Sequence, residues 1–218
     1  MRSLTGEEVL AQAQNILTRL IRLAQLASNP GLIDSAYTET PAKFVVLDGL
    51  LADYLQTLET KVIVWTSFVG NINALMRRYE SLNPVCIHGG MDGAAKQRSV
   101  KAFRKSPTVR LLIANLAAAR EGLTLTEANT AIYVDRTFNL VDFLQSQDRI
   151  HRLSQTRPCN IILLMGAGTI DEFVDFSLEQ KYRLARYAQN DVDNITTEDL
   201  AFEKRQLLRA LVEQAPLV

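Results

Sequence analysis

The sequence of 218 residues lacks the features that mark several large classes of protein. It has only two cysteines, Cys86 and Cys159, which lie far apart in apolar runs and so exclude a disulfide framework or a metal-ligand spacing. Its most apolar stretch, LLIANLAAA, is short and is interrupted by Asn115. Glu7 and Glu8 stand where a signal peptide would be cationic and then apolar. We therefore expect no membrane contact and a reducing compartment, cytoplasmic or, in a eukaryote, nuclear.

An excess of charge of one sign is also missing. The 24 lysines and arginines balance the 24 aspartates and glutamates, so the formal net charge is zero. This excludes a global basic field that would draw the molecule onto nucleic acid, and any DNA binding must come from local patches. The hydrophobic fraction of 47% and the charged fraction of 22% are typical of a globular protein with one well-buried core.

The parts that hold ATP in a phosphate-loop motor are absent from the sequence. The stretch GMDGAAKQ only approaches the loop GxxxxGKS or GxxxxGKT, because Ala95 and Gln97 replace the required glycine and hydroxyl. The only Asp-Glu pair, Asp171 and Glu172, opens a predicted helix instead of following an apolar strand. After the first predicted strand TSFVGN offers no GxGxxG, which argues against a Rossmann-type enzyme. We do not expect this chain to hydrolyse ATP alone.

What the sequence does contain is a regular alternation of strand and helix patterns. The apolar, β-branched runs are of the kind that forms strands buried on both faces, and they lie at 61–68, 84–88, 109–115, 130–135 and 160–165. Helical patterns separate them. Strict alternation predicts an α/β fold with a parallel sheet covered on both faces.

A long amphipathic helix is predicted before this sheet, over residues 5–28. Thr5 and Glu8 form a capping box, and Asn29 begins the stop signal. Its apolar face comprises Val9, Ala13, Ile16, Leu20, Ala24 and Ala27. We divide the chain into a helical extension (1–40), a lobe (41–190) and a C-terminal helix (191–218).

The stretch QSQDRIHRLSQ, residues 145–155, carries the strongest functional signal. It follows a predicted strand, and Asn139 is placed to cap a helix that would contain it. On that helix Gln145, Arg149 and Arg152 would share one face. The planar guanidinium of arginine stays protonated and donates bidentately to phosphate oxygens. The pattern predicts two guanidiniums presented together to a phosphate.

An isolated RxxR would more simply indicate a solvated helix face that is salt-bridged to Asp148. The surrounding residues favour the alternative, that the two arginines bind a phosphate. QSQDRIHRLSQ resembles motif VI of superfamily 2 helicases, in the form QxxDRxHRxxQ typical of the Swi/Snf family of DNA-dependent ATPases. The resemblance implies the second of two RecA-like lobes, whose arginines reach across a cleft to ATP held by the first. By position, Arg149 and Arg152 are the arginine fingers, and Gln145 and His151 fall on the motif's Gln and His.

Other segments resemble the same family. KVIVWTSF (61–68) is similar to motif IV, and Thr66 and Ser67 at its polar exit are candidates either for a DNA phosphate contact or for capping the next helix. Gly89 and Gly90, after the second strand, let the backbone approach a phosphate closely.

Residues 109–135 resemble motif V, in which Gly122 is expected near the nucleotide and Thr124 near a DNA phosphate; Arg120 and Glu121 depart from the small residues usual there. Lys96, in a segment similar to LDGSTxxExRQxxIxxF, is a further DNA candidate. The basic stripe on the same predicted helix is either a solvated face or a means of steering phosphate, and it comprises Arg98, Lys101 and Lys105.

The resemblance implies half of an enzyme: a lobe that acts on double-stranded DNA with a first RecA-like lobe on the same or a separate polypeptide. ATP and Mg²⁺ would be held mainly by that first lobe. The alternative is a non-catalytic nucleic-acid or protein-binding module that keeps the lobe's fold.

Overall fold

The computed structural model describes residues 6–188, with side chains for 14–118 and 122–187. Five parallel strands form one sheet in the order β2-β3-β1-β4-β5. The strands are β1 (Val62–Thr66), β2 (Val85–Ile87), β3 (Leu111–Asn115), β4 (Thr130–Tyr133) and β5 (Asn160–Leu163). The predicted α/β fold with a parallel, RecA-like sheet is confirmed, and each predicted strand is present.

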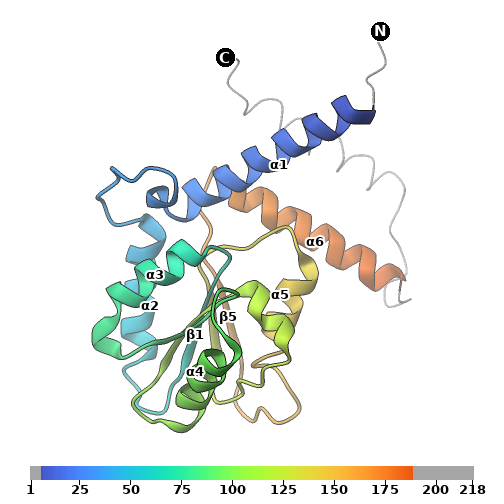
Figure 1. The fold of residues 1–218 in the computed structure, drawn as a ribbon. Helices are drawn as coiled ribbons and strands as arrows, with labels where there is room; N and C mark the ends of the chain where they lie inside the picture. Colours follow the sequence, from blue (N-terminus) through green and yellow to red (C-terminus); the bar gives the residue numbers. More distant parts are fainter. Residues whose placement is uncertain (1–5, 189–218) are drawn as a thin grey trace. The chain divides into compact units, whose positions relative to one another are not determined.

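Helices cover both faces of the sheet (Figure 1). Because successive strand residues point to opposite faces, β1 sends Val62 and Val64 to one core and Ile63 and Trp65 to the other. The first core is closed by α2 (Ala42–Tyr54) and α3 (Val69–Arg78), and the second by α4 (Gly93–Lys105) and α5 (Leu140–Gln147).

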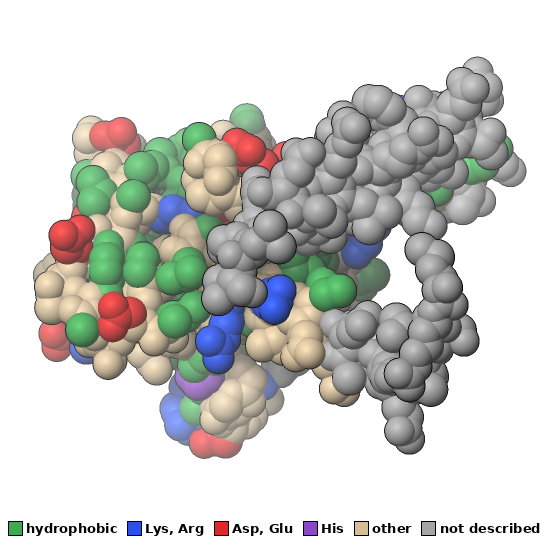
Figure 2. Space-filling view, turned by 90° about the horizontal axis from the view of Figure 1, so that it is seen from above, with side chains coloured by type: hydrophobic (Ala, Val, Ile, Leu, Met, Phe, Trp, Pro, Cys, Tyr) green, Lys and Arg blue, Asp and Glu red, His purple; other side chains and the backbone are tan. Residues whose placement is uncertain are grey.

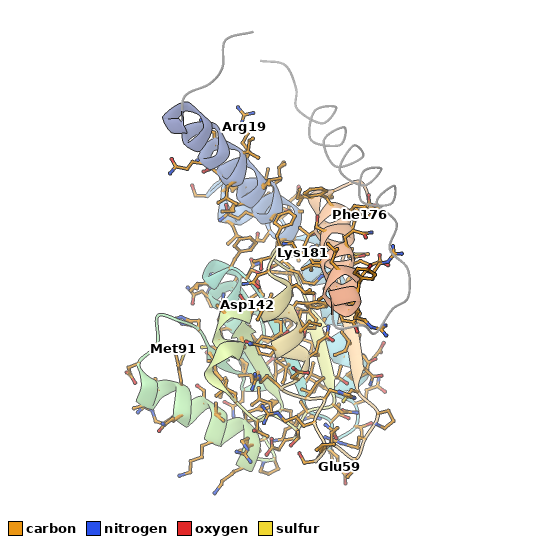
Figure 3. The ribbon with its side chains drawn as sticks, turned by 90° about the vertical axis from the view of Figure 1, so that its right-hand side faces the viewer. Arg19, Glu59, Met91, Asp142, Phe176 and Lys181 are labelled. Atoms are coloured by element: carbon orange, nitrogen blue, oxygen red, sulfur yellow. The ribbon has the colours of Figure 1, made fainter. Side chains whose placement is uncertain are left out.

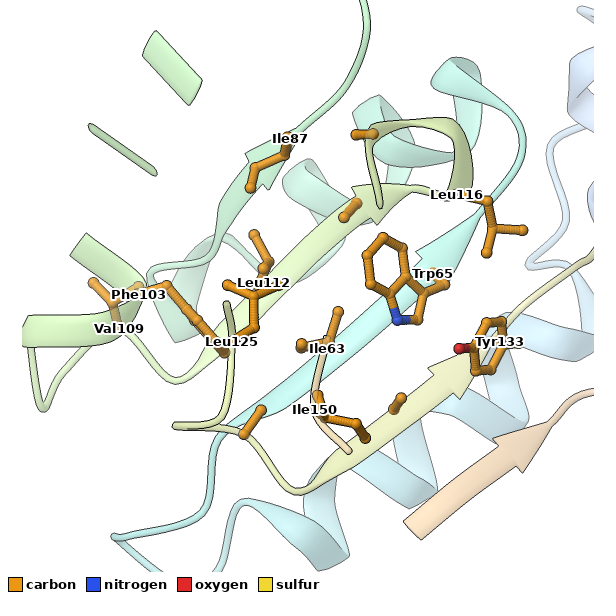
Figure 4. Packing of buried hydrophobic residues seen from close by; sticks show 14 residues of the cluster. Ile63, Trp65, Ile87, Phe103, Val109, Leu112, Leu116, Leu125, Tyr133 and Ile150 are labelled. Atoms are coloured by element: carbon orange, nitrogen blue, oxygen red, sulfur yellow. The ribbon is translucent and has the colours of Figure 1, made fainter. Parts of the chain in front are cut away.

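The second core supports the face on which the functional segments lie (Figure 4). Trp65 stacks on Tyr133 at a centroid separation of 6.4 Å, and Tyr133 meets Phe143 of α5 edge-on at 5.2 Å. The Tyr133 hydroxyl and Ser146 Oγ are 2.7 Å apart. Val100 and Phe103 of α4 face this core, which leaves the basic residues of α4 outside.

The carboxyl ends of the strands define one edge of the sheet. In Figure 3, Met91, before α4, and Asp142, at the start of α5, lie toward this edge, whereas Glu59, before β1, lies at the opposite end. In parallel sheets ligands bind at the carboxyl edge, so this edge is where a site is expected.

Helix α1 (Gly6–Ser28) has the extent predicted, and among its described side chains, from Gln14 onward, burial begins at Leu20. On the predicted apolar face, Leu20, Ala24 and Ala27 are half-buried, whereas Ile16 is 51% exposed. The predicted Thr5 cap lies outside the described residues. Asn29 ends the helix, and its side chain accepts from the Gly31 amide at 2.9 Å.

Helix α6 (Ile170–Ala188) begins with two acidic residues, as predicted. Asp171 accepts from the Gly166 amide at 2.8 Å and pairs with the buried Lys43 at 2.5 Å, which joins this helix start to α2. The contacts group residues through Glu172 in one compact unit, and residues 173–188 belong to a second. The proposed domain limits stay predictions, and the predicted helix at 191–218 lies outside the described residues.

Among residues 6–188, no helix is long and apolar enough to cross a membrane. Both cysteines are free, half-buried thiols, and burial raises the pKa of each. Cys159 packs against the second core and Cys86 against the first.

Candidate functional site

A buried carboxylate organises the carboxyl edge between β1 and β4. Asp135 is 3% exposed, and its Oδ2 accepts from Ser28 Oγ at 2.7 Å, Thr66 Oγ1 at 2.6 Å and Asn71 Nδ2 at 3.1 Å. Its Oδ1 accepts from the Ser67 amide at 2.6 Å. Four donors from α1, β1 and α3 thus converge on one side chain.

This network overturns one of the predicted DNA contacts. Thr66 has no exposed surface; its hydroxyl donates to Asp135 and accepts from the Phe68 amide at 3.3 Å, so it cannot meet a phosphate. Ser67 is only half-buried, although its hydroxyl oxygen is covered and has no partner among the described residues. Ser67 therefore stays a candidate. The sequence signal for Asp135 was an acid directly after an apolar strand, a position that demands partners.

The loop after β2 exposes Gly89 and Gly90 at the same edge. The Gly90 amide donates to His88 Nδ1 at 3.2 Å, so this histidine after β2 is bonded within its own loop. Asp92 then caps α4 by accepting from the Ala95 amide at 2.6 Å.

Lys96 lies on the first turn of α4, in a shallow groove of about 560 Å³ between α4 and the segment from Leu123 to Glu127. Lys101, Arg104 and Lys105 also line this groove, and the Arg104 guanidinium pairs with Glu127 at 2.7 Å. The exposed side of α4 is therefore basic. On the face that Figure 2 shows, acidic and basic side chains are scattered among apolar ones.

The motif V segment continues from β3. Asn115 caps the short helix Leu116–Glu121, and Gly122 ends it with a left-handed φ of 70°, a conformation that glycine adopts without strain. The side chains of Arg120 and Glu121, which depart from the family pattern, lie outside the described ones. Residues 123–128, which we call the 123–128 loop, lead from Gly122 toward β4.

Helix α5 begins as predicted and ends earlier than predicted. The Asn139 side chain accepts from the Val141 and Asp142 amides, which confirms the cap. The helix stops at Gln147, because the Arg149 and Ile150 amides bond three residues back, at 3.3 Å and 3.1 Å, and tighten the chain into turns. The single helical face shared by Gln145, Arg149 and Arg152 was therefore wrong; both arginines belong to a turn spanning 148–155.

Arg149 is turned inward, and its residue is 7% exposed. Its Nε donates to the Gln145 carbonyl at 3.0 Å, and its Nη1 donates to the Leu123 carbonyl at 3.1 Å. Burial lowers the pKa of the guanidinium and nearby Arg152 lowers it further, while Asp148 opposes both. The arginine remains protonated and satisfies a carbonyl left open at the end of α5.

Arg152 is half-buried and bonds to the same loop. Its Nε donates to the Asp148 carbonyl at 2.9 Å, its Nη1 to the Thr124 hydroxyl at 2.8 Å and its Nη2 to the Leu123 carbonyl at 3.3 Å. The structure thus brings together Arg149, Arg152, Thr124 and neighbouring Gly122.

Gln145 and His151, the other two motif residues, differ in their burial. The Gln145 Oε1 atom is covered and has no partner among the described residues, whereas His151 is exposed. Sequence reasoning gave no role to Gln155, whose side chain bonds to the backbone of the 123–128 loop. Its only sequence signal was its place as the last letter of QSQDRIHRLSQ.

Comparison with known proteins places these features in a family. The helicase conserved C-terminal domain model matches residues 42–154, just over half of the chain. The putative ATP-dependent helicase/translocase YwqA of Bacillus subtilis is 30% identical over 212 residues, which cover 92% of this chain and 22% of that protein. The human lymphoid-specific helicase is 30% identical over 142 residues, 64% of this chain and 17% of that protein. The chain spans about a fifth of the length of such relatives.

A solved structure agrees in fold. The Sulfolobus solfataricus SWI2/SNF2 ATPase core in complex with dsDNA superposes with a TM-score of 0.69 and 23% identity, over 97% of this chain and 44% of that chain. The C-terminal part of the Fun30 ATPase domain gives a TM-score of 0.61 at 20% identity, over 88% and 63% of the two chains. With the matched domain and the motifs it contains, this chain belongs to the helicase conserved C-terminal domain family, as a second RecA-like lobe of the Swi/Snf type.

Proposed function

We propose that this chain is the second motor lobe of an ATP-dependent translocase that moves on double-stranded DNA. The observation that carries the proposal is the position of Arg152, half-buried at the exit of α5, beside Thr124 and the Leu123 carbonyl. Arg152 is only half-buried, which supports its being accessible to a second lobe.

ATP and Mg²⁺ would be held mainly by a first RecA-like lobe, on the same or a separate polypeptide, with Gly122 facing the nucleotide. Bound ATP supplies the phosphoryl group whose transfer develops charge on its oxygens. Arg152 would exchange its bonds to Thr124 and Leu123 for bonds to those oxygens, which are stronger because both partners are charged. Arg149 would have to give up its bond to the Leu123 carbonyl before it could bind phosphate. Gln145, whose Oε1 is covered and has no partner among the described residues, is the third proposed catalytic residue.

The DNA backbone would be contacted along the same edge. The proposed contacts are the exposed backbone at Gly89 and Gly90, the Lys96 ammonium, and Ser67 and Thr124. Backbone amides and lysines bind phosphate without reading the base sequence, which suits a motor that must move over any sequence. Thr124 becomes available when Arg152 leaves it.

The proposal is tested by Arg152→Ala in a polypeptide that joins this chain to a first lobe. We expect DNA-stimulated ATP hydrolysis to fall by about 10³-fold or more while nucleotide affinity stays nearly unchanged. Arg77→Ala, at an exposed arginine in the last turn of α3, is the matched control and should retain turnover. Unchanged hydrolysis in the Arg152 variant would refute the finger assignment.

The inward contacts of both arginines favour one second candidate, a nucleic-acid or protein-binding module that keeps the lobe but has lost the chemistry. In that case the guanidiniums serve only to bind the 123–128 loop. Absence of DNA-stimulated hydrolysis in the joined polypeptide with unaltered arginines would favour this candidate.

A further inference from the structure

Gln155 joins two segments through the NH₂ group of its side-chain amide. Nε2 donates to the Ala128 carbonyl at 2.8 Å and the Thr126 carbonyl at 3.1 Å, and it lies 3.3 Å from the Ile150 carbonyl. Oε1 accepts from the Arg157 amide at 3.1 Å. One half-buried side chain therefore bonds to the 123–128 loop and to the 148–155 turn.

The same two segments are bonded at their other end by the arginines. Arg149 and Arg152 both donate to the Leu123 carbonyl, and the Leu125 amide donates to the Arg149 carbonyl at 3.0 Å. The backbone amide of Gln155 in turn donates to the Arg152 carbonyl at 2.8 Å. The arginines hold the start of the loop, and Gln155 holds its end.

We infer that Gln155 is a positioning residue that keeps the 123–128 loop in register with the 148–155 turn. The inference rests on the proposed function and deepens it. When the guanidiniums turn toward phosphate, the loop loses the bonds at Leu123 and Thr124, and the bonds from Gln155 are among those that remain. Gln155 thereby keeps the backbone of the 123–128 loop beside that of the 148–155 turn while the arginine side chains move, so that the loop carrying Thr124 and the turn carrying Arg152 move together.

Three substitutions distinguish the effect of the hydrogen-bond donor of Gln155 from the effect of its side-chain shape. Gln155→Glu keeps the shape but puts an acceptor against carbonyls, and Gln155→Met removes the donor without adding charge. Gln155→Lys keeps a donor, because an ammonium has three hydrogens to offer to the three carbonyls. Gln56→Glu, at an exposed glutamine after α2, makes the same chemical change elsewhere and is the matched control.

Hydrogen exchange on this chain gives the first readout. The Leu125 amide, whose acceptor is the Arg149 carbonyl, should exchange about tenfold faster in the Gln155→Glu variant and near the original rate in the Gln155→Lys variant. The Val64 amide, in the central strand, should stay unchanged. If the Glu variant does not fold, the Met variant decides. Unchanged exchange at Leu125 in the folded variant that lacks the donor overturns the inference.

Turnover in the polypeptide joined to a first lobe gives the second readout. We expect Gln155→Glu to lower kcat of DNA-stimulated hydrolysis about tenfold with KM for ATP within about twofold, since Gln155 does not touch the nucleotide, and Gln155→Lys to restore kcat. If Arg152→Ala abolishes turnover but Gln155→Glu does not change it, the positioning role fails alone. If Arg152→Ala leaves turnover unchanged, the proposed function fails whatever Gln155 does.

Discussion

At the scale of single residues, the carboxyl edge depends on Asp135 more than on the hydroxyls around it. A carboxylate only accepts, and each bond it makes here comes from a neutral donor: two hydroxyls, one side-chain amide and one backbone amide. Hydrogen bonds to a charged group contribute more than bonds between neutral groups. Thr66 is consequently part of the scaffold that orients the Ser67 backbone, and Ser28 ties the end of α1 to it.

Replacing this carboxylate should destabilise the lobe. In Asp135→Asn one carboxylate oxygen becomes an NH₂ group that faces donors, so we expect the free energy of unfolding to fall by roughly 2–4 kcal/mol. Urea denaturation followed by circular dichroism measures it. Asp53→Asn, at an exposed position of α2, should change stability by less than about 0.5 kcal/mol. Equal midpoints for the two variants would show that the network does not stabilise the fold.

At the scale of elements, α5 shows what a local signal can and cannot determine. The Asn139 cap is a matter of neighbouring backbone amides and was predicted from the sequence. Beyond Gln147 the chain forms turns, in which the two arginines bond to Leu123 and Thr124; these acceptors are distant in sequence, so no local signal predicts the contacts. The strands were also predictable from local sequence, because apolar, β-branched runs are typical of strands buried on both faces.

The cap itself should contribute measurably to stability. Asn139→Ala leaves the Val141 and Asp142 amides without their side-chain acceptor, and we expect a loss of about 1 kcal/mol. Asn139→Ser, which also caps well, should recover most of it. Thermal unfolding of the three proteins is the measurement, and a Ser variant no more stable than the Ala variant would contradict the capping role.

The pairing of α2 with α3 predicts a pH dependence. Asp48 of α2 accepts from Arg78 of α3 and from the Tyr79 hydroxyl at 2.9 Å. The hydrogen bond from Arg78 is the main cause that lowers the pKa of Asp48, although burial opposes it. A lowered folded pKa means that this stabilisation is present above the unfolded pKa of about 3.9 and is lost as pH falls through the folded value.

Asp48→Asn should therefore destabilise the protein at neutral pH, by less than about 1 kcal/mol because the pair is partly exposed and screened. The difference between variant and parent should shrink below about pH 4. Urea midpoints across an acid series test this. A difference that grows as pH falls would have the wrong sign for the bond described.

At the scale of the whole molecule, the sequence predicted which motifs are present but not the hydrogen bonds between them. The fold brings the residues that follow Gly122 against the 148–155 turn, and both segments were recognised from the sequence by their motifs. That each arginine would be bonded to the other motif's backbone follows from how the segments pack, and no periodicity encodes it. Because the net charge is zero, any DNA affinity must come from local basic groups, and the exposed side of α4 is one such group.

This charge distribution leads to a prediction for DNA binding by the chain. A lobe without a global basic field should bind duplex DNA weakly, with Kd of about 10⁻⁴ to 10⁻⁶ M at physiological salt, independently of base sequence. Each phosphate contact adds about 0.9 to the slope of log K against log salt.

Lys96→Gln should weaken binding to all sequences alike and reduce that slope by about 1, as measured by fluorescence anisotropy over a salt series. Arg77→Gln removes the same charge from the last turn of α3, at the opposite end of the sheet, and should leave the slope unchanged. Equal effects of the two substitutions would mean that only net charge matters and that DNA does not follow the carboxyl edge.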